Sequence, residues 1–328
     1  MSKNIKEKKI KTLSKNETWV FSDGTRGMEN QSIAVAKMLN NNFKLIHYNP
    51  PYFLKKFPLL GKIYFPDCLT KIIKADFKPS YIITTGRRMS GTSIALKTIL
   101  KNKVKTIHIQ NPKLSLKHFD LLLIPEHDGL KGRNIIQTKG ALCFFDNNDI
   151  RNLKKSQSNE IKVKDNLVLL MVGGNSKKLI PQNSEYYDLC IKVIKGVKSI
   201  NGQLIVIVSR RTPNKAIKIL ESNFTKHLGD FKIFYPEDNN IYPQILKIID
   251  YIIVTSDSVN MISETASLSI PLFISHFSRE NKKILSFIEN LKKLGIVKSF
   301  EGYLFDYSKK TLQTNKNSIL KINKFFRF

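Results

Sequence analysis

A short polar turn, Ser256-Asp257-Ser258, follows the apolar run YIIVT and precedes a helical pattern that contains Glu264. Residues 251–274 predict a buried strand, this turn, an amphipathic helix and a second buried strand. Open α/β sheets bind ligands at the carboxyl ends of their strands, and the free N–H groups of a helix start favour anions. The turn and Glu264 therefore predict a site for a nucleotide, with the carboxylate on the ribose. An ordinary connection with a serine N-cap fits the same residues.

Two more predicted strands of the second half end in residues suited to phosphate, VGGNSKK (172–178) and VSRRTP (208–213). Glycines allow backbone contact with a ligand, and arginines can neutralise a diphosphate leaving group. Parallel strands share their carboxyl edge, so we expect these loops to converge with the polar turn. Since Asp257 would repel a diphosphate, we expect it to bond a sugar hydroxyl or to orient the loop. The predicted donor-site residues are Gly173, Gly174, Asn175, Ser176, Arg210, Arg211, Ser256, Asp257, Ser258 and Glu264.

The first half has two comparable strand ends, SDGTRGMENQ (22–31) and TTGRRMSGTS (84–93). The first allows a tight glycine turn around an arginine, and the second places two arginines before a helix that Ser90 is expected to cap. Neither matches a dinucleotide or P-loop fingerprint. A glycine-assisted turn and a solvated basic turn remain the structural alternatives. The predicted acceptor-site residues are Asp23, Gly24, Arg26, Gly27, Gln31, Arg87 and Arg88.

A candidate general base follows a further strand, in the segment IPEHDG (124–129). His127 or Asp128 could take a proton from an acceptor hydroxyl at the edge of a cleft, although a polar surface loop is an equal alternative. The sequence has no Asp-x-Asp motif, no His/Cys cluster with metal-ligand spacing and no G-x-S-x-G elbow. We therefore predict chemistry that uses neither a metal ion nor a cofactor.

Short apolar runs alternate with helical periodicity along most of the chain, and this alternation is typical of parallel sheets. It occurs twice, on either side of the polar, lysine-rich stretch 146–164. The pattern predicts an α/β fold of two Rossmann-like domains that face a cleft. We expect a disordered basic tail at 1–16, an acceptor-side domain at 17–150, and a nucleotide-binding domain at 151–328 that ends in a tail.

Composition limits the class of protein. The chain has 328 residues, a formal net charge of +29 and three scattered cysteines in apolar contexts, Cys68, Cys143 and Cys190. The cysteines indicate reduced core residues, and the sequence has neither a secretory signal nor a membrane-spanning run. We expect a cytoplasmic protein, peripheral to the inner face of the membrane. The charge suits anionic partners, but an A+T-rich genome also produces lysine-rich chains. Because the charge is diffuse, we expect no nucleic-acid partner.

One segment, NPPYFLKKFPLLGKIYFP (49–66), alternates aromatic residues with lysines and contains no acidic residue. It fits neither a regular strand nor a long helix. A protruding loop that inserts Phe53, Phe57 and Tyr64 into an anionic bilayer surface would explain it. A loop folded under its domain would explain it equally well.

The ordered set SDGTRGMENQ, TTGRR, IPEHDG, VGGNS, SRRTP and VTSDSVNMISE resembles the bacterial members of the mitochondrial fission ELM (elongated mitochondria) family. The resemblance runs from about Trp19 to about Ser275. The family is similar to GT-B glycosyltransferases, which implies a GT-B-like fold here. Its plant members are implicated in mitochondrial fission as recruiters of a dynamin-like protein to the outer membrane.

These observations give two main functional hypotheses. The first is a metal-independent glycosyltransferase that uses a nucleotide-sugar at the membrane face, with Glu264 on the ribose and Gly174, Ser256 and Ser258 near the diphosphate. Arg26 and Arg87 would hold the acceptor. The second is a non-catalytic, membrane-associated adaptor that keeps the fold. A nucleic-acid binder is a third hypothesis that rests on charge alone.

Overall fold

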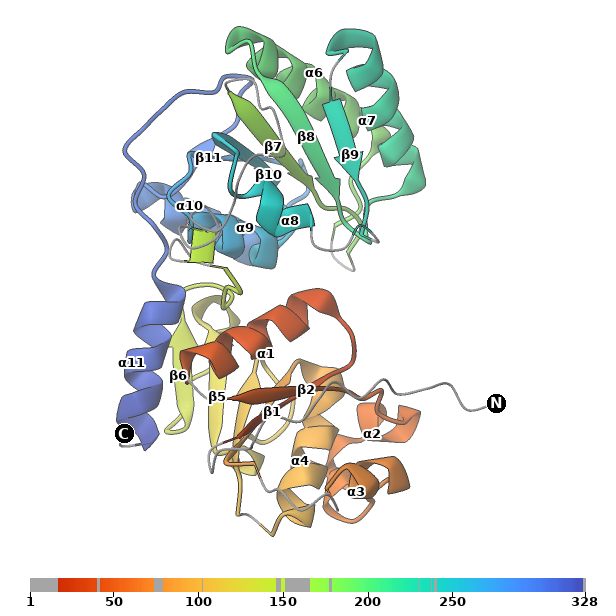
Figure 1. Cartoon of the computed structure of the whole chain (residues 1–328), viewed down its shortest axis with the longest axis vertical. Coiled ribbons are helices and arrows are strands. Elements are labelled where there is room, and N and C mark those ends of the chain that lie inside the picture. The colour runs from red at the N-terminus through yellow and green to blue at the C-terminus, as the bar shows by residue number, and fades with distance from the viewer. Residues whose placement is uncertain are drawn as a thin grey trace. The chain divides into compact units, whose positions relative to one another are not determined.

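Two parallel sheets form the framework of the chain in a computed structural model (Figure 1). The predicted α/β fold is therefore confirmed. The structure describes residues 17–39, 42–73, 79–101, 103–145, 149–150, 166–176, 179–229, 231–236, 238 and 241–326. The expected tail at 1–16 lies outside the described residues.

The first sheet has the strand order β2-β1-β3-β4-β5-β6, and its paired strands are parallel. Its strands are β1 (Thr18–Ser22), β2 (Phe43–His47), β3 (Tyr81–Thr85), β4 (Lys105–Ile109), β5 (Leu121–Pro125) and β6 (Ile135–Thr138). The α-helices of this part are α1 (Arg26–Met38), α2 (Tyr52–Lys56), α3 (Asp67–Ile73) and α4 (Ser90–Ile99). Short 3₁₀ helices span Pro58–Lys62, Arg87–Met89, Leu116–His118 and Glu126–Asp128.

The second sheet has the order β12-β11-β10-β7-β8-β9, again with parallel pairs. Its strands are β7 (Leu167–Val172), β8 (Gln203–Val208), β9 (Phe231–Phe234), β10 (Tyr251–Thr255), β11 (Leu272–Ser275) and β12 (Lys298–Ser299). The α-helices are α6 (Asn183–Ser199), α7 (Asn214–His227), α8 (Ile241–Ile245), α9 (Val259–Ala266), α10 (Lys282–Lys293) and α11 (Thr314–Phe326).

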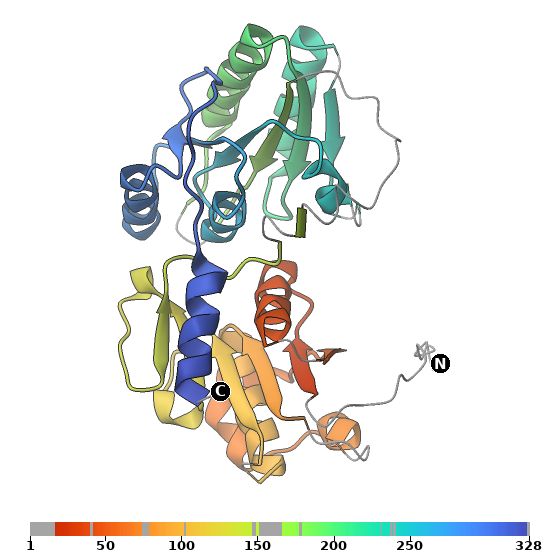
Figure 2. The same ribbon diagram turned by 60° about the vertical axis from the view of Figure 1, so that its left-hand side comes forward.

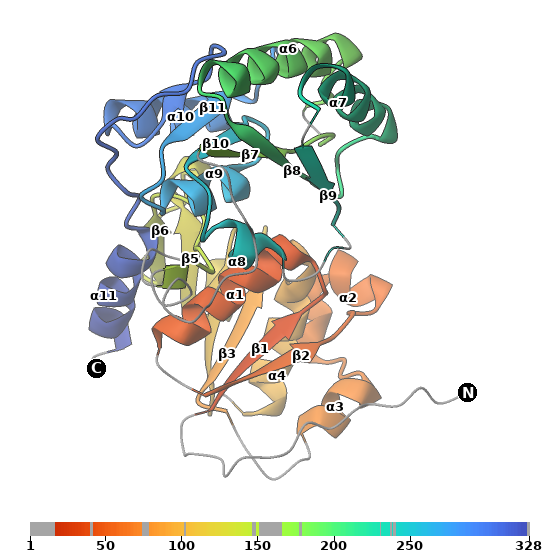
Figure 3. The ribbon, with the colours of Figure 1, turned by 45° about the horizontal axis from the view of Figure 1, so that its top comes forward.

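Strand β7 shows why the central strands are apolar throughout. Val168 and Leu170 pack into one core with residues of α6 and α7, whereas Leu167 and Leu169 pack into a second core with residues of α8, α9 and α10. Figure 3 shows these two helical layers on opposite faces of the second sheet. Side chains of a strand alternate between faces, so a strand covered on both sides needs apolar residues at every position.

The first sheet is covered in the same way. Helix α4 packs on the face that carries Trp19, Phe21 and Ile82. Helix α1 lies on the opposite face, where Ser32 Oγ and Thr85 Oγ1 form a buried hydrogen bond of 2.6 Å (Figure 3). This bond fixes α1 beside the carboxyl end of β3, so the loops that follow β1 and β3 are held on a rigid base.

The chain divides into two compact units earlier than the expected boundary between 150 and 151. The first unit contains residues up to Thr138 and then Asn317–Phe328, and the second contains Lys139–Lys316. Residues just after β6 explain the difference. The backbone N–H of Ala141 donates to Ser263 Oγ at 2.9 Å, and that of Cys143 donates to Asn315 Oδ1 at 3.0 Å. Residues 141–143 therefore belong to the second unit.

The C-terminal segment contains a helix, α11, and not only the tail that the sequence analysis expected. Its residues from Asn317 onward belong to the first unit (Figure 2). The rings of Phe326 and Tyr81 are 5.5 Å apart at their centroids, and Lys105 Nζ lies 4.8 Å from the Phe326 ring. Ile322 is fully buried. The end of the chain thus completes the unit that its beginning starts.

The sequence analysis expected no membrane-spanning segment and three reduced cysteines in the core. The helices described here are too short or too polar to cross a membrane. Cys143 and Cys190 are buried free thiols, and burial raises the pKa of Cys190 to about 12. The side chain of Cys68 lies outside the described residues.

His108 is a fully buried histidine of β4 that should make stability depend on pH. Its Nδ1 and Thr84 Oγ1 are 2.7 Å apart, and burial lowers its pKa to about 3. The unfolded chain binds a proton near pH 6.5 that the folded chain excludes, so the stability is complete above pH 6.5 and is lost as the pH falls towards 3. We expect a loss of about 2 kcal/mol between pH 6.5 and 5 from this residue.

Urea unfolding at several pH values tests this expectation. His108→Gln should keep a hydrogen bond to Thr84 while removing the titrating group, and should flatten the acid slope. His227→Gln is the matched control because His227 is exposed at the end of α7. An unchanged slope in the His108 variant would contradict the assignment.

Candidate functional site

The order in which strands are added to the second sheet reverses at β7. The chain runs from β7 to β8 and β9 on one side, and then to β10, β11 and β12 on the other. The point between β7 and β10 is therefore a topological switch point, where open α/β sheets bind their ligands. The loops that follow these two strands begin with Gly173 and Ser256. The predicted convergence of strand ends thus falls where the topology opens a crevice.

Asp257 holds the loops at this switch point together. Its side chain is fully buried and accepts three hydrogen bonds: from the Gly174 N–H at 3.0 Å, from Thr255 Oγ1 at 2.7 Å and from Arg211 Nη2 at 2.7 Å. The Gly173 N–H in turn donates to Thr255 Oγ1 at 2.8 Å. One carboxylate therefore connects the ends of β7 and β10 with the loop after β8. This geometry agrees with the loop-orienting role considered for Asp257.

The two positions after β7 require glycine because other parts of the loops approach their backbone closely. A Cβ at Gly173 would lie 2.0 Å from both carboxylate oxygens of Asp257, and one at Gly174 would lie 2.1 Å from the Arg211 carbonyl oxygen. The Asn175 N–H donates to that same carbonyl oxygen at 2.9 Å. The glycine pair thus allows the β7 and β8 loops to touch along their backbones.

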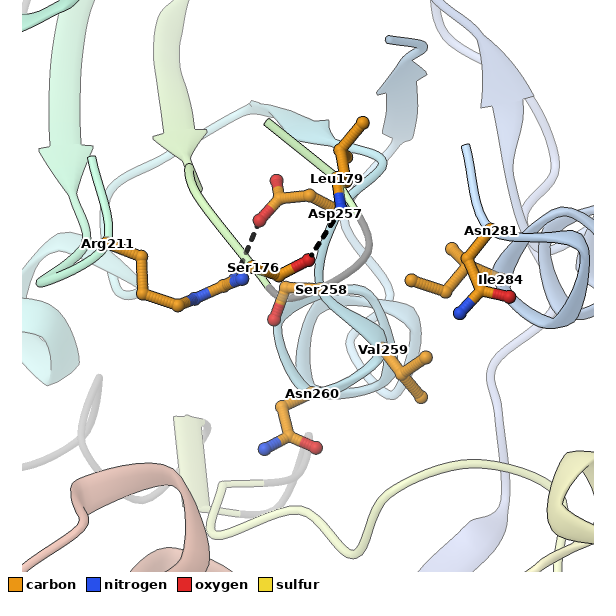
Figure 4. Close-up of a pocket in the computed structure, with 9 residues that line it drawn as sticks. All are labelled: Ser176, Leu179, Arg211, Asp257, Ser258, Val259, Asn260, Asn281 and Ile284. Carbon is orange, nitrogen blue, oxygen red and sulfur yellow. Dashed lines mark hydrogen bonds and ion pairs between the residues drawn. The ribbon is translucent and has the colours of Figure 1, made fainter. Parts of the chain in front are cut away.

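An open pocket of about 480 Å³ borders the Asp257–Arg211 ion pair. Figure 4 shows Arg211 reaching towards Asp257 from the loop after β8, while Asn281 and Ile284 come from the start of α10. The pocket is lined by Ser176, Leu179, Arg211, Asp257, Ser258, Val259, Asn260, Asn281 and Ile284. The side chain of Arg211 is 37% exposed and lines the pocket.

Helix α9 begins at this pocket and is held at both ends. Ser258 is its N-cap, with the hydroxyl accepting a hydrogen bond from the Met261 N–H at 3.4 Å. Lys309 Nζ donates to the carbonyl oxygens of Thr265, at 3.2 Å, and Leu268. Burial lowers the pKa of Lys309 to about 7. The first turn of α9 therefore offers a fixed positive dipole end to the pocket.

Glu264 does not line the pocket. It stands four residues after Asn260 and hence on the same helical face, further along α9. Its carboxylate lies near Tyr242, whose pKa is raised well above its usual value, first by burial and then by Glu264. Reach from Glu264 to a ribose bound at the pocket stays a prediction.

The remaining donor-site predictions divide into three groups. Ser176 lines the pocket and accepts a hydrogen bond from the Leu179 N–H at 3.1 Å. Asn175 and Arg210 are exposed outside the lining. Ser256 is fully buried, and its hydroxyl accepts the Phe277 N–H at 3.1 Å.

Sequence reasoning missed several residues of the site. Tyr186, on α6, has a buried hydroxyl without a hydrogen-bond partner among the described residues. Burial and then the Asp257 carboxylate raise its pKa. In the sequence Tyr186 is one apolar position of an amphipathic helix, and nothing there indicates that its hydroxyl lies near Asp257. The lining residues that were not predicted are Leu179, Val259, Asn260, Asn281 and Ile284.

The first sheet has its own switch point between β1 and β3. Asp23 follows β1 and forms an ion pair with Arg88 at 3.8 Å, with the Arg88 side chain 71% exposed. The Gly24 N–H donates to Ser22 Oγ and the Thr25 N–H to Asp23 Oδ1, each at 3.0 Å. Gly24 has φ +80°, the conformation that favours glycine. The turn therefore satisfies these two backbone N–H groups with its own side chains.

The other acceptor-side predictions lie around this turn. Arg26 is the first residue of α1 and is exposed, as is Arg87. Gln31 is buried, and its Nε2 donates to the Gly27 carbonyl oxygen at 3.2 Å. Ser90 is not the N-cap of α4: it is the first residue of that helix, and its hydroxyl donates to the Arg87 carbonyl oxygen at 2.6 Å.

His127 and Asp128 lie in the 3₁₀ helix Glu126–Asp128 after β5, and both are half-buried. Gly129 ends this turn with φ +71°. Their role as a base stays a prediction. Across the described residues, no group of histidine, cysteine, aspartate and glutamate side chains could hold a metal ion.

Comparison with known proteins identifies the family. Residues 26–322 match the family described as mitochondrial fission ELM1. The chain belongs to this family. An uncharacterized protein of Rickettsia prowazekii (strain Madrid E) is 29% identical over 93% of this chain and 99% of its own length. The mitochondrial fission protein ELM1 of Arabidopsis thaliana is 23% identical over 72% of this chain and 64% of its own length. The resemblance to the ELM family seen in the motifs is thus confirmed.

Solved structures of GT-B type show the same fold as this ELM1 family member. The MnaA–UDP co-structure of S. aureus gives a TM-score of 0.52 at 12% identity, covering 95% of this chain and 97% of that one. The UDP-GlcNAc 2-epimerase of Neisseria meningitidis bound to UDP-GlcNAc gives 0.50 at 13% identity, covering 94% and 100%. At this identity, the likeness establishes the fold alone.

Proposed function

We propose that this member of the ELM1 family binds a nucleotide-sugar in the pocket of its second unit and transfers the sugar without a metal ion. One observation carries the proposal: the pocket lies at a topological switch point and combines the first turn of α9 with a partly exposed Arg211. Helix starts and arginines are preferred binders of phosphate. The UDP and UDP-GlcNAc named for the two similar structures support this choice of ligand.

In this proposal the diphosphate lies against the N-terminus of α9. Ser258 and the exposed part of Arg211 donate to its oxygens, and Glu264 accepts from the ribose hydroxyls. Asp257 makes no contact with phosphate. It keeps Arg211 in position and joins the loops after β7 and β10 through the hydrogen bonds that both make to its carboxylate. The positive groups would stabilise the leaving diphosphate in place of a metal ion.

The acceptor part of the proposal rests on residues of the first unit. Arg26, Arg87 and Arg88 are exposed cations suited to an anionic acceptor. His127 or Asp128 would take the proton from the attacking hydroxyl. The acceptor would be presented at the cytoplasmic face of a membrane.

One observation favours the second function, a non-catalytic adaptor. The Gly174 N–H and one N–H of Arg211 already donate to Asp257, so a carboxylate of the protein occupies donors that phosphate would use. A pocket whose donors are satisfied internally can persist as a structural element of the fold. Binding of nucleotides separates the two functions.

Isothermal titration calorimetry with UDP, ADP, GDP and UDP-GlcNAc tests the donor site. We expect one of these ligands to bind, and Arg211→Gln and Glu264→Ala each to weaken it by about ten- to a hundredfold. A lost charge-assisted hydrogen bond of about 1.5–3 kcal/mol accounts for this range.

The chain supplies a matched control for the arginine. Arg210→Gln removes the same charge from the neighbouring position, which is exposed and does not line the pocket, and should leave the affinity nearly unchanged. Equal loss in both arginine variants would indicate diffuse attraction by net charge. Absence of nucleotide and nucleotide-sugar binding by the natural chain would support the adaptor.

A further inference from the structure

An apolar surface of the first unit is formed by a few neighbouring residues. Large apolar side chains are exposed to between 42% and 79% within the segment that contains α2 and the 3₁₀ helix Pro58–Lys62. Solvent-exposed apolar clusters of this kind mark interaction sites. We call this surface the 52–64 patch; its members are Tyr52, Phe57, Leu59, Ile63 and Tyr64.

The 52–64 patch stands on a rigid base and matches neither of the two alternatives, a protruding loop or a loop folded wholly under its domain. Leu54 is fully buried. A Cβ at Gly61 would lie 2.4 Å from the Gly91 carbonyl oxygen, and one at Gly91 would lie 2.6 Å from that of Leu54. Both short helices therefore rest directly on the backbone of α4. Because their small and buried residues face α4, their large apolar residues are held in the solvent.

The exposed set also differs from the predicted one. Phe57 and Tyr64 are exposed as expected, but Phe53 is half-buried and packs edge-on against Tyr64, with ring centroids 4.7 Å apart. Phe53 therefore packs against a member of the patch and does not project into solvent with it. Tyr52 and Ile63 are the two most exposed members, at 73% and 79%, although the sequence analysis did not name them as inserting residues.

Positive charge surrounds the 52–64 patch. Lys56 Nζ lies 5.7 Å from the Tyr52 ring and 5.5 Å from the Phe57 ring, and residues 49–66 contain no acidic residue. Lys62 and Lys117 are close enough to His118 to lower its pKa, after the larger effect of burial. In the part of the chain that the structure describes, neither Lys56 nor Lys62 has an ion-pair partner.

We propose that the 52–64 patch docks on the surface of an anionic phospholipid bilayer. Aromatic and aliphatic side chains enter the headgroup boundary, while the lysines at their base contact lipid phosphates. Lys56 Nζ lies beside the Tyr52 and Phe57 rings, so the charged and the apolar groups reach one interface together. A protein partner of ordinary composition would offer carboxylates but no continuous apolar phase for five projecting side chains. The proposal stands independently of sugar transfer.

Co-sedimentation of the full chain with vesicles tests the apolar part. Vesicles of phosphatidylglycerol and phosphatidylcholine should bind the natural chain, and Phe57→Ser/Ile63→Ser should reduce partitioning roughly tenfold. Ile191→Ser/Leu320→Ser removes two side chains of similar exposure, each 63%, from α6 and α11 and should leave partitioning unchanged. All four residues are exposed, so the fold should persist in both variants.

The charged part is tested in the same assay. Lys56→Gln/Lys62→Gln should remove the salt-sensitive fraction of binding, since such contacts are screened over roughly 8–10 Å at physiological salt. Lys218→Gln/Lys226→Gln removes equal charge from exposed positions of α7 and should have a small effect. Equal effects of both lysine pairs, with no effect of Phe57→Ser/Ile63→Ser, would identify a charge-only surface and overturn the proposal.

Fluorescence provides a direct measure of insertion. The chain has one tryptophan, Trp19, which is only 3% exposed and serves as a constant background. The emission of Ile63→Trp should shift to the blue on addition of anionic vesicles, whereas that of Leu320→Trp should not. No shift in the first variant, or no vesicle binding by the natural chain at low salt, would also overturn the proposal.

Discussion

Replacement of Gly173 by alanine should lower the free energy of unfolding by about 3–5 kcal/mol and abolish binding at the pocket. The new Cβ would lie 2.0 Å from both oxygens of Asp257. The carboxylate would have to move, and its bonds to the Gly174 N–H and to Arg211 would break. Breaking an ion pair whose carboxylate is fully buried and leaving a buried N–H without an acceptor produce losses of this size. Urea unfolding gives the stability, and calorimetry with UDP gives the binding.

Two variants make this expectation specific to the clash. Gly132→Ala is the control, because a Cβ there would meet only Ile135 and Leu116 at ordinary distances of 3.4 Å and more. It should change stability by less than about 0.5 kcal/mol. In the double variant Gly173→Ala/Asp257→Ala the clash is absent, so the total loss should fall below the sum of the single losses by about 1–2 kcal/mol. Additive losses would contradict the assigned contact.

Loss of the proposed general base should slow the proposed sugar transfer by about a hundredfold to ten-thousandfold without weakening nucleotide binding. The residue is one of two neighbours in the turn after β5, so His127→Asn and Asp128→Asn are compared. In the proposed mechanism the base acts on the attacking hydroxyl and makes no contact with the nucleotide. The reaction rate should therefore fall while the affinity for the nucleotide stays the same. Release of nucleoside diphosphate from the nucleotide-sugar that binds most tightly measures the rate.

The same turn supplies the control for this prediction. Glu126→Gln changes an exposed carboxylate of the 3₁₀ helix and should retain the natural rate within about twofold. If the variants of His127 and Asp128 both kept the rate of the natural chain, neither residue could be the base. No release by the natural chain would favour the adaptor.

The framework of the fold could be predicted because burial on both faces leaves a direct mark in the sequence. Strands β7 and β10 are apolar at nearly every position, and each ends in glycine or in small polar residues. Parallel strands share their carboxyl edge, so the meeting of Gly174 and Asp257 followed from the order of elements. Their contact, 3.0 Å between the backbone nitrogen of Gly174 and Oδ2 of Asp257, lies at that edge.

Other features depend on contacts between residues far apart in sequence. Nothing in the pair Arg210-Arg211 shows that one side chain turns inward to Asp257 while its neighbour remains exposed. Asn281 and Ile284 enter the pocket because α10 begins beside it, which is a consequence of tertiary packing. The early domain boundary likewise depends on Ser263 and Asn315, which accept hydrogen bonds from the backbone of the residues after β6.

Helix α11 has a consequence for the order in which the protein can fold during its synthesis. Residues 317–328 belong to the first unit, although the whole second unit separates them from the rest of it. The ribosome therefore synthesises the whole second unit before it makes the segment that covers Tyr81. A nascent chain folds from its N-terminus as it emerges, so the first unit must wait with this surface uncovered. The part that is made first is the part that is finished last.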